Sequence, residues 1–185
     1  MISDILAQTE HNMSKTVEVS KEEFATIRTG RAHPAMFAKI TADYYGQATP
    51  IQQLATFQSP EARTLIITPY DQSSLKAIEK AIRDSDLGVN PSNDGHSIRV
   101  VLPTLTEERR KEYTKLARSK AEEGRVAIRN ARRHAVDAVK KLEKDKEIGE
   151  DDVKRTEKKL DDITKKHIDA VDDLLKRKEA ELLEV

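Results

Sequence analysis

The sequence predicts an α+β protein: an elongated antiparallel three-helix bundle interrupted by a small inserted α+β domain. Two observations lead to this class. All six prolines, four of the six glycines and five of the seven aromatic residues of the 185-residue chain lie within residues 30–104. Because proline clashes inside a helix and lacks a backbone donor, the chain on either side is free to form long helices. A content of 37% hydrophobic and 36% charged residues also suits thin bundles better than a thick core.

The first helix is expected over residues 3–28. Hydrophobic side chains recur there every three or four positions, which is the period of one helix face. Ser3 is expected to cap the start of this helix, and Gly30 to follow its end.

A second, longer helix is expected over residues 106–145, and a third after a turn at Gly149. The second begins with Thr106 followed by two glutamates, a typical N-terminal sequence. The third carries hydrophobic residues at helical spacing from Val153 to Leu182. Small residues dominate the stripe of the second helix and allow neighbouring helices to approach closely, so the three helices are expected to form an antiparallel bundle. This stripe consists of Tyr113, Ala117, Ala121, Gly124, Ile128, Ala131, Ala135, Ala138 and Leu142.

The insert has the composition of strands packed around one helix. Its β-branched and aromatic segments are bounded by glycine and proline, as strands commonly are. Hydrophobic residues at helical spacing predict a single helix over Ser73–Ser85. The insert is therefore expected to be a small β/α/β domain. The predicted strands are Ala38–Tyr45, Ile51–Phe57, Arg63–Pro69 and His96–Leu102.

These elements predict two domains: residues 1–29 plus 106–185 form the bundle, and residues 30–105 form the insert. Two chain crossings join them, which permits hinge motion but prevents free tumbling. We call these crossings the hinge segments. They consist of Thr29, Gly30 and Arg31 in the first and Pro103, Thr104, Leu105 and Thr106 in the second.

The composition also bounds the location and chemistry of the protein. With no cysteine, the chain has no disulfide scaffold, thiolate nucleophile or cysteine metal site. The first ten residues lack the basic start and apolar core of a signal peptide, and no apolar run is long enough to span a bilayer. The expected location is the cytoplasm, with no membrane partner.

The formal net charge of zero conceals a charge asymmetry. Residues 105–145 contain 13 lysines and arginines against 8 carboxylates, whereas residues 150–185 contain 9 against 12. One helix is therefore basic and its expected neighbour acidic. Charge pairing inside a bundle would explain this asymmetry, and so would a nucleic-acid partner.

Four arginines of the second helix, which we call the arginine ridge, are spaced 7, 4 and 3 residues apart. At about 100° per residue they fall within an arc of roughly 60°, beside the hydrophobic stripe. A guanidinium matches phosphate oxygens and stacks on bases, so the ridge fits a nucleic-acid backbone. Pairing with Glu122, Glu123 or carboxylates of neighbouring helices is the alternative. The ridge consists of Arg118, Arg125, Arg129 and Arg132, with Arg133 adding charge beside it.

The sequence offers no catalytic or metal-binding motif and no cofactor fingerprint. Its five histidines are scattered, and the place of His167 near a hydrophobic seam favours a packed side chain over a ligand. The acidic pairs at 151–152, 161–162 and 172–173 favour a solvated face, because adjacent residues diverge around a helix. The segment Asn93-Asp94-Gly95 is typical of a turn.

Five segments of the chain resemble the ribosome recycling factor family, in order and over the whole length. They are Ile27-Arg-Thr-Gly-Arg-Ala32, Tyr44-Tyr45-Gly46, Ile82-Arg-Asp-Ser-Asp-Leu-Gly-Val-Asn-Pro91, Leu102-Pro-Thr-Leu-Thr-Glu-Glu-Arg-Arg-Lys111 and Arg125-Val-Ala-Ile-Arg-Asn-Ala-Arg-Arg133.

The resemblance implies an L-shaped monomer that acts as a non-enzymatic translation factor. Its bundle would bind ribosomal RNA of the large subunit after termination, with the ridge in contact; by motif match this role falls on Arg129, Arg132 and Arg133. Its insert would face elongation factor G, and GTP hydrolysis by that partner would drive subunit dissociation. A structural adaptor that binds partner helices without RNA, and a hydrolase of a translation substrate, are the rival classes.

Overall fold

The structure, a computed structural model, describes residues 1–184, in two compact units. One unit contains Met1–Phe24 and Lys115–Glu179, and the other contains Ala25–Thr114 and the chain from Ala180. The combination of long helices with a small sheet-containing part confirms the predicted α+β class. The predicted domain boundaries and the L-shaped outline stay predictions.

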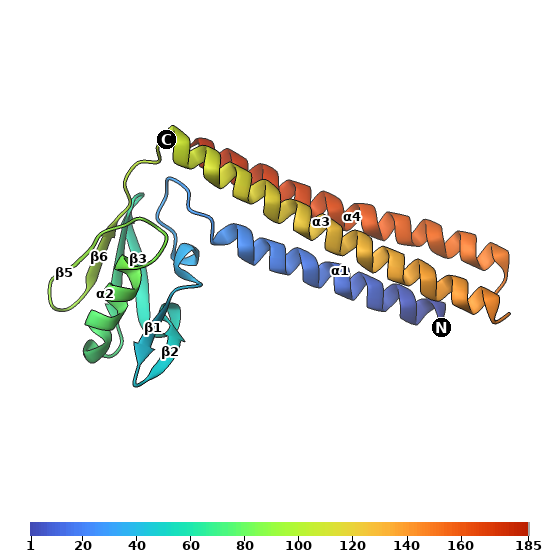
Figure 1. The fold of residues 1–185 in the computed structure, drawn as a ribbon, viewed down its shortest axis with the longest axis horizontal. Helices are drawn as coiled ribbons and strands as arrows, with labels where there is room; N and C mark the ends of the chain where they lie inside the picture. Colours follow the sequence, from blue (N-terminus) through green and yellow to red (C-terminus); the bar gives the residue numbers. More distant parts are fainter. Residues whose placement is uncertain (185) are drawn as a thin grey trace. The chain divides into compact units, whose positions relative to one another are not determined.

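The three long helices lie side by side in the first unit (Figure 1), with α3 antiparallel to both α1 and α4. The first helix begins at Ile2, so the prediction that Ser3 caps it is wrong: the amide of Ile5 already bonds to the carbonyl of Met1 at 3.2 Å. It also ends three residues before the predicted end at residue 28. The long helices are α1 (Ile2–Ala25), α3 (Glu107–Lys144) and α4 (Glu150–Leu183).

The core of the bundle is narrow because small residues line it. Ala117, Ala121 and Ile128 of the predicted stripe are fully buried. A Cβ added to Gly124 would lie 2.8 Å from the Oγ of Ser20 on α1 and 3.6 Å from both γ-carbons of Val171 on α4. This glycine therefore sits where α3 closely approaches both α1 and α4.

Local hydrogen bonds fix the ends of the long helices. Thr106 caps α3, as its sequence predicts: its hydroxyl accepts from the amide of Arg109 at 3.1 Å. Between α3 and α4 the chain turns sharply, with Lys146 at a positive φ of 61°. The amide of Gly149 then donates to the carboxylate of Asp152 at 3.2 Å. The turn at Lys146 and the bond from Gly149 to Asp152 direct α4 back along α3.

The insert in the second unit contains a two-stranded hairpin, a four-stranded sheet and one short helix. The hairpin pairs β1 with β2, and the larger sheet is fully antiparallel in the order β3-β4-β6-β5. The strands are β1 (Thr41–Tyr44), β2 (Gln47–Pro50), β3 (Ala55–Glu61), β4 (Thr64–Pro69), β5 (Pro91–Asn93) and β6 (Ile98–Val101). The helices are α2 (Leu75–Arg83) and the 3₁₀ segments η1 (Pro34–Phe37), η2 (Ile51–Gln53) and η3 (Gln72–Ser74).

Two strands of the insert, β2 and β5, escape prediction from the sequence. Both are short and polar, both contain a proline, and each pairs with only one neighbour. The predicted strand over residues 51–57 is wrong at its start, since Ile51–Gln53 forms a 3₁₀ turn and β3 begins only at Ala55. β2 and β5 form because they pair with neighbouring strands, and a local sequence pattern does not reveal that pairing.

The core of the insert lies among the strands, α2 and the 3₁₀ segment η1. Ile67 and Ile98 of adjacent strands and Ile78 and Ile82 of α2 are fully buried in it. The turn predicted at residues 93–95 is present: Asn93 ends β5, and the chain reverses over residues 94–97 before β6. There the carboxylate of Asp94 accepts from the amides of two following residues at 2.9 and 2.8 Å, which lowers its pKa.

Candidate functional site

The arginine ridge runs along one face of α3, and its guanidinium groups are partly open to solvent. The side chains of Arg118 and Arg129 are 66% and 54% exposed, and that of Arg132 is 37% exposed. Arg125 is the most covered, at 21%. Helical spacing thus predicts correctly that these residues share a face beside the buried stripe.

Three ridge arginines each contact one carboxylate of α4. The pairs are Arg118 with Glu179 at 2.9 Å, Arg125 with Asp172 at 2.7 Å and Arg132 with Asp161 at 2.7 Å. The residue numbers of the carboxylates fall along this series while those of the arginines rise, as expected for antiparallel helices. An ordered row of ion pairs therefore follows the seam between the two helices.

The fourth arginine is held by its own helix. Glu122 accepts from Arg125 at 3.0 Å and from Arg129 at 3.2 Å, so one carboxylate links two members of the ridge. These hydrogen bonds lower the pKa of Glu122, and the bond from Arg125 has the larger effect. The pKa of Arg125 is raised, chiefly by its bond to Asp172. Every ridge arginine therefore has a carboxylate partner.

These pairs match the alternative interpretation of the ridge, in which carboxylates of a neighbouring helix pair with the arginines. Asp161 and Asp172 belong to acidic pairs that were expected to form a solvated face; their side chains are 61% and 41% exposed, but each also binds a guanidinium of α3. Arg133, in contrast, is exposed, and no carboxylate of residues 1–184 pairs with it. The site thus combines paired arginines at the seam with one free arginine beside them.

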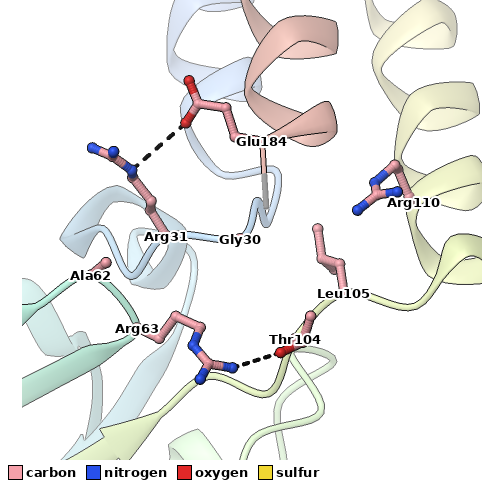
Figure 2. A pocket seen from close by; sticks show the side chains of 8 residues that line it. All are labelled: Gly30, Arg31, Ala62, Arg63, Thr104, Leu105, Arg110 and Glu184. Carbon is pink, nitrogen blue, oxygen red and sulfur yellow. Dashed lines mark hydrogen bonds and ion pairs between the residues drawn. The ribbon is translucent and has the colours of Figure 1, made fainter.

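The hinge segments lie close together around a cavity of about 570 Å³ within the second unit. Figure 2 shows Gly30 and Arg31 on one side of it and Thr104 and Leu105 on another. Arg31 pairs with Glu184 at 3.6 Å, and a guanidinium nitrogen of residue 63 donates to the hydroxyl of Thr104 at 2.7 Å. Side chains from several elements therefore hold both hinge segments.

One contributor to this region was missed by the sequence analysis. Arg28 is only 5% exposed, and its guanidinium donates to the backbone carbonyl of Pro103 in the other hinge segment. Its Nε has no hydrogen-bond partner within residues 1–184. The sequence does not indicate that Arg28 is buried, because its burial depends on the second hinge segment, which lies far along the chain.

The remaining candidate of the sequence is His167, near the hydrophobic seam of α4. His167 is 6% exposed, with its ring nitrogens 2.7 Å from the carbonyl of Ile163 and 3.2 Å from the hydroxyl of Ser14, and is a packed side chain as interpreted. Across residues 1–184, histidine and carboxylate side chains form no group of three that could hold a metal ion. No helix in this same range combines the length and the apolar character needed to cross a membrane.

The fold and this surface define a class: an α+β protein with three long helices and a row of ion-paired arginines along one of them. The family model described as ribosome recycling factor matches residues 20–183. Ribosome-recycling factors of Kocuria rhizophila and Cutibacterium acnes are 63% and 61% identical to this chain, over 99% and 100% of both sequences. The chain belongs to the ribosome recycling factor family, and it is a translation factor of ribosome recycling.

Two solved structures of this family have a similar fold. A solution structure of a ribosome recycling factor superposes with a TM-score of 0.79 at 43% identity, covering 100% of this chain and 98% of the other. The second, at a TM-score of 0.72 and 47% identity with complete coverage of both chains, is the T. thermophilus factor. It was described together with E. coli elongation factor G, bound to the E. coli post-termination complex.

Proposed function

We propose that this protein binds the large ribosomal subunit through ribosomal RNA after termination, with the arginine ridge and Arg133 in contact. With elongation factor G and GTP hydrolysis by that factor, it promotes dissociation of the subunits. The similarity to a factor described on the post-termination complex beside elongation factor G supports this proposal. The observation that carries it is the partly exposed row of arginines on α3.

The ion pairs of the ridge are compatible with RNA binding because they are weak. Exposed pairs contribute only about 0–1 kcal/mol each, so a phosphate can replace a carboxylate at little cost. Arg133 needs no such exchange. The carboxylates also hold the guanidinium groups in an ordered row before the partner arrives, which reduces the entropy lost on binding.

Salt dependence separates this proposal from the adaptor alternative. An RNA-binding surface releases counterions, so its affinity for ribosomes should fall steeply with salt. An adaptor would bind partner helices through apolar side chains such as Val19 and Val126, which are about half exposed, and salt would affect it little. Co-sedimentation with purified ribosomes at about 50 and about 200 mM salt measures how steeply the affinity falls with salt. A flat slope would reject the RNA contact.

We expect the protein to have no nucleotide, peptide-ester or phosphodiester turnover of its own. Its site offers ion-paired arginines and no nucleophile held by a general base, so GTP hydrolysis belongs to the partner. The check is phosphate release from GTP by the purified protein with and without elongation factor G. Release by the protein alone that a point substitution in it abolishes would contradict this expectation.

We further propose that the insert moves as a rigid body about the hinge segments, and that the protein works as a monomer in the cytoplasm. Spin labels on Val19 of α1 and Gln47 of β2, both exposed, would report the distance between bundle and insert. The expected result is a broad distribution for the free protein that narrows on ribosomes. A narrow distribution that ribosomes leave unchanged would exclude the hinge.

A further inference from the structure

The turn between β1 and β2 contains a residue that the turn itself disfavours. Tyr45 and Gly46 form a two-residue hairpin loop and have φ values of 51° and 83°. Such a loop favours asparagine or aspartate before glycine, because side chains such as tyrosine are strained at positive φ. Tyr45 is also 81% exposed, so burial of its ring does not compensate for the strain. Backbone strain of this kind concentrates at functional positions.

Neighbouring groups hold the Tyr45 ring in a defined place. Its hydroxyl and that of Tyr44 donate to the same carboxylate oxygen of Asp71, at 3.3 and 3.2 Å. The two rings meet edge to face at an interplanar angle of 69°, with centroids 4.6 Å apart. The other oxygen of Asp71 accepts from the amide and hydroxyl of Ser73 at 2.9 and 2.7 Å. Two aromatic rings and one carboxylate therefore form a small, preorganised cluster.

The cluster is anionic, and the nearest basic residues along the chain, Lys39 and Lys76, each lie five residues from it. Residues 40–51 and 64–75, which supply it, contain Asp43 and Asp71 and no lysine or arginine. Hydrogen bonds, chiefly from Ser73, lower the pKa of Asp71, so this carboxylate is charged at neutral pH. The tyrosine bonds to Asp71 are longer than the usual 2.7–2.8 Å or so of O–H···O bonds. The oxygen that accepts them can therefore take a stronger donor.

We propose that Tyr44, Tyr45 and Asp71 receive an arginine side chain of a protein partner. A guanidinium can stack on an aromatic face and at the same time donate to a carboxylate, and it is more weakly hydrated than an ammonium. An RNA strand could stack on the rings, but Asp71 would repel its phosphates, so the cluster fits a basic protein segment. The arginine ridge plays no part in this proposal, which goes beyond the proposed function.

The test titrates the purified protein with the blocked peptide Ac-Gly-Arg-Gly-amide and follows the tyrosine ring resonances by NMR. The chain has only four tyrosines, so single Tyr→Phe variants assign them. The peptide Ac-Gly-citrulline-Gly-amide is the matched ligand, because citrulline keeps the planar shape and lacks the charge. We expect saturable shifts at Tyr44 and Tyr45, about two- to fivefold weaker binding of the citrulline peptide, and no shift at Tyr113 on α3.

Two variants separate binding from folding. Tyr45→Asn suits the turn, so it should keep or raise the melting temperature while removing the arginine-induced shift at Tyr44. Asp71→Asn can still accept from Ser73 but has no charge, and it should weaken binding about two- to fivefold. Equal shifts from both peptides, binding retained in both variants, or no shift at all would overturn the proposal. So would larger shifts with the single-stranded oligonucleotide U₅.

Discussion

Replacement of Arg132 by alanine is expected to weaken binding to ribosomes about tenfold or more while the bundle stays folded. A charge-assisted contact to phosphate or base is worth on the order of 1–3 kcal/mol. The ion pair that the substitution removes, to Asp161 at 2.7 Å, is exposed on the carboxylate side and contributes only about 0–1 kcal/mol to stability. Ribosome affinity and melting temperature, measured on the same preparation, give the two effects separately.

Asp161→Asn is the matched control for this prediction. It breaks the same ion pair but keeps the guanidinium, so its effect on stability should equal that of Arg132→Ala while ribosome binding is unchanged or tighter. Arg155→Ala removes an exposed arginine that pairs with Asp152 on α4, outside the ridge, and should leave ribosome binding unchanged. Arg132→Lys should restore binding only in part, because an ammonium lacks the bidentate fork.

Arg132 would be structural if two results coincided. These are a loss of several kcal/mol in the free energy of unfolding for Arg132→Ala, and normal binding by the fraction that remains folded. In that case the ridge would be a seam of ion pairs, and the RNA contact would have to lie elsewhere on α3.

Ile128→Ala is expected to lower the free energy of unfolding by about 3 kcal/mol, the largest effect on stability that we predict. The Ile128 side chain is fully buried in the narrow core of the bundle. Truncation removes three carbon atoms from that core, and long helices can relax only partly into the space. Urea unfolding followed by the helical circular dichroism signal measures the loss.

Val126→Ala is the internal control, two residues away on α3. Its side chain is 45% exposed, so the expected loss is within about 0.5 kcal/mol. Similar losses for the two variants would mean that α3 does not bury the predicted stripe in the folded protein.

The long helices could be predicted because hydrophobic spacing alone specifies which face is buried. The stripe on α3 and the Thr106 cap are local signals: Ala117 to Ala135 supply five of its buried members, while its two ends are only partly buried, and the cap is present. The short strands β2 and β5 could not be predicted, because they depend on pairing with distant residues. The missed Arg28 follows the same rule, since the carbonyl that it binds lies 75 residues along the chain.

For the candidate site, the sequence predicts which arginines lie on one face of α3 but not which carboxylates they contact. Helical geometry places the four ridge arginines on one face, but their ion-pair partners depend on how α4 is aligned against α3. That alignment brings Asp161 to Arg132 and Asp172 to Arg125. A sequence in which acidic pairs recur along the helix offers several carboxylates to each arginine, so spacing cannot choose among them.

Because α1 packs against α4, the bundle cannot be completed until both ends of the chain have been synthesised. Ser14 contacts His167, 153 residues later, so the first helix to leave the ribosome can be covered in part by α3 but cannot complete its burial until the last helix is made. At about 5–20 residues per second this delay lasts roughly 8–30 s. The insert is continuous in sequence and can fold meanwhile. A nascent chain of this factor therefore exposes Met13 and Phe24 through most of its own translation, a period in which a chaperone at the exit tunnel would protect it.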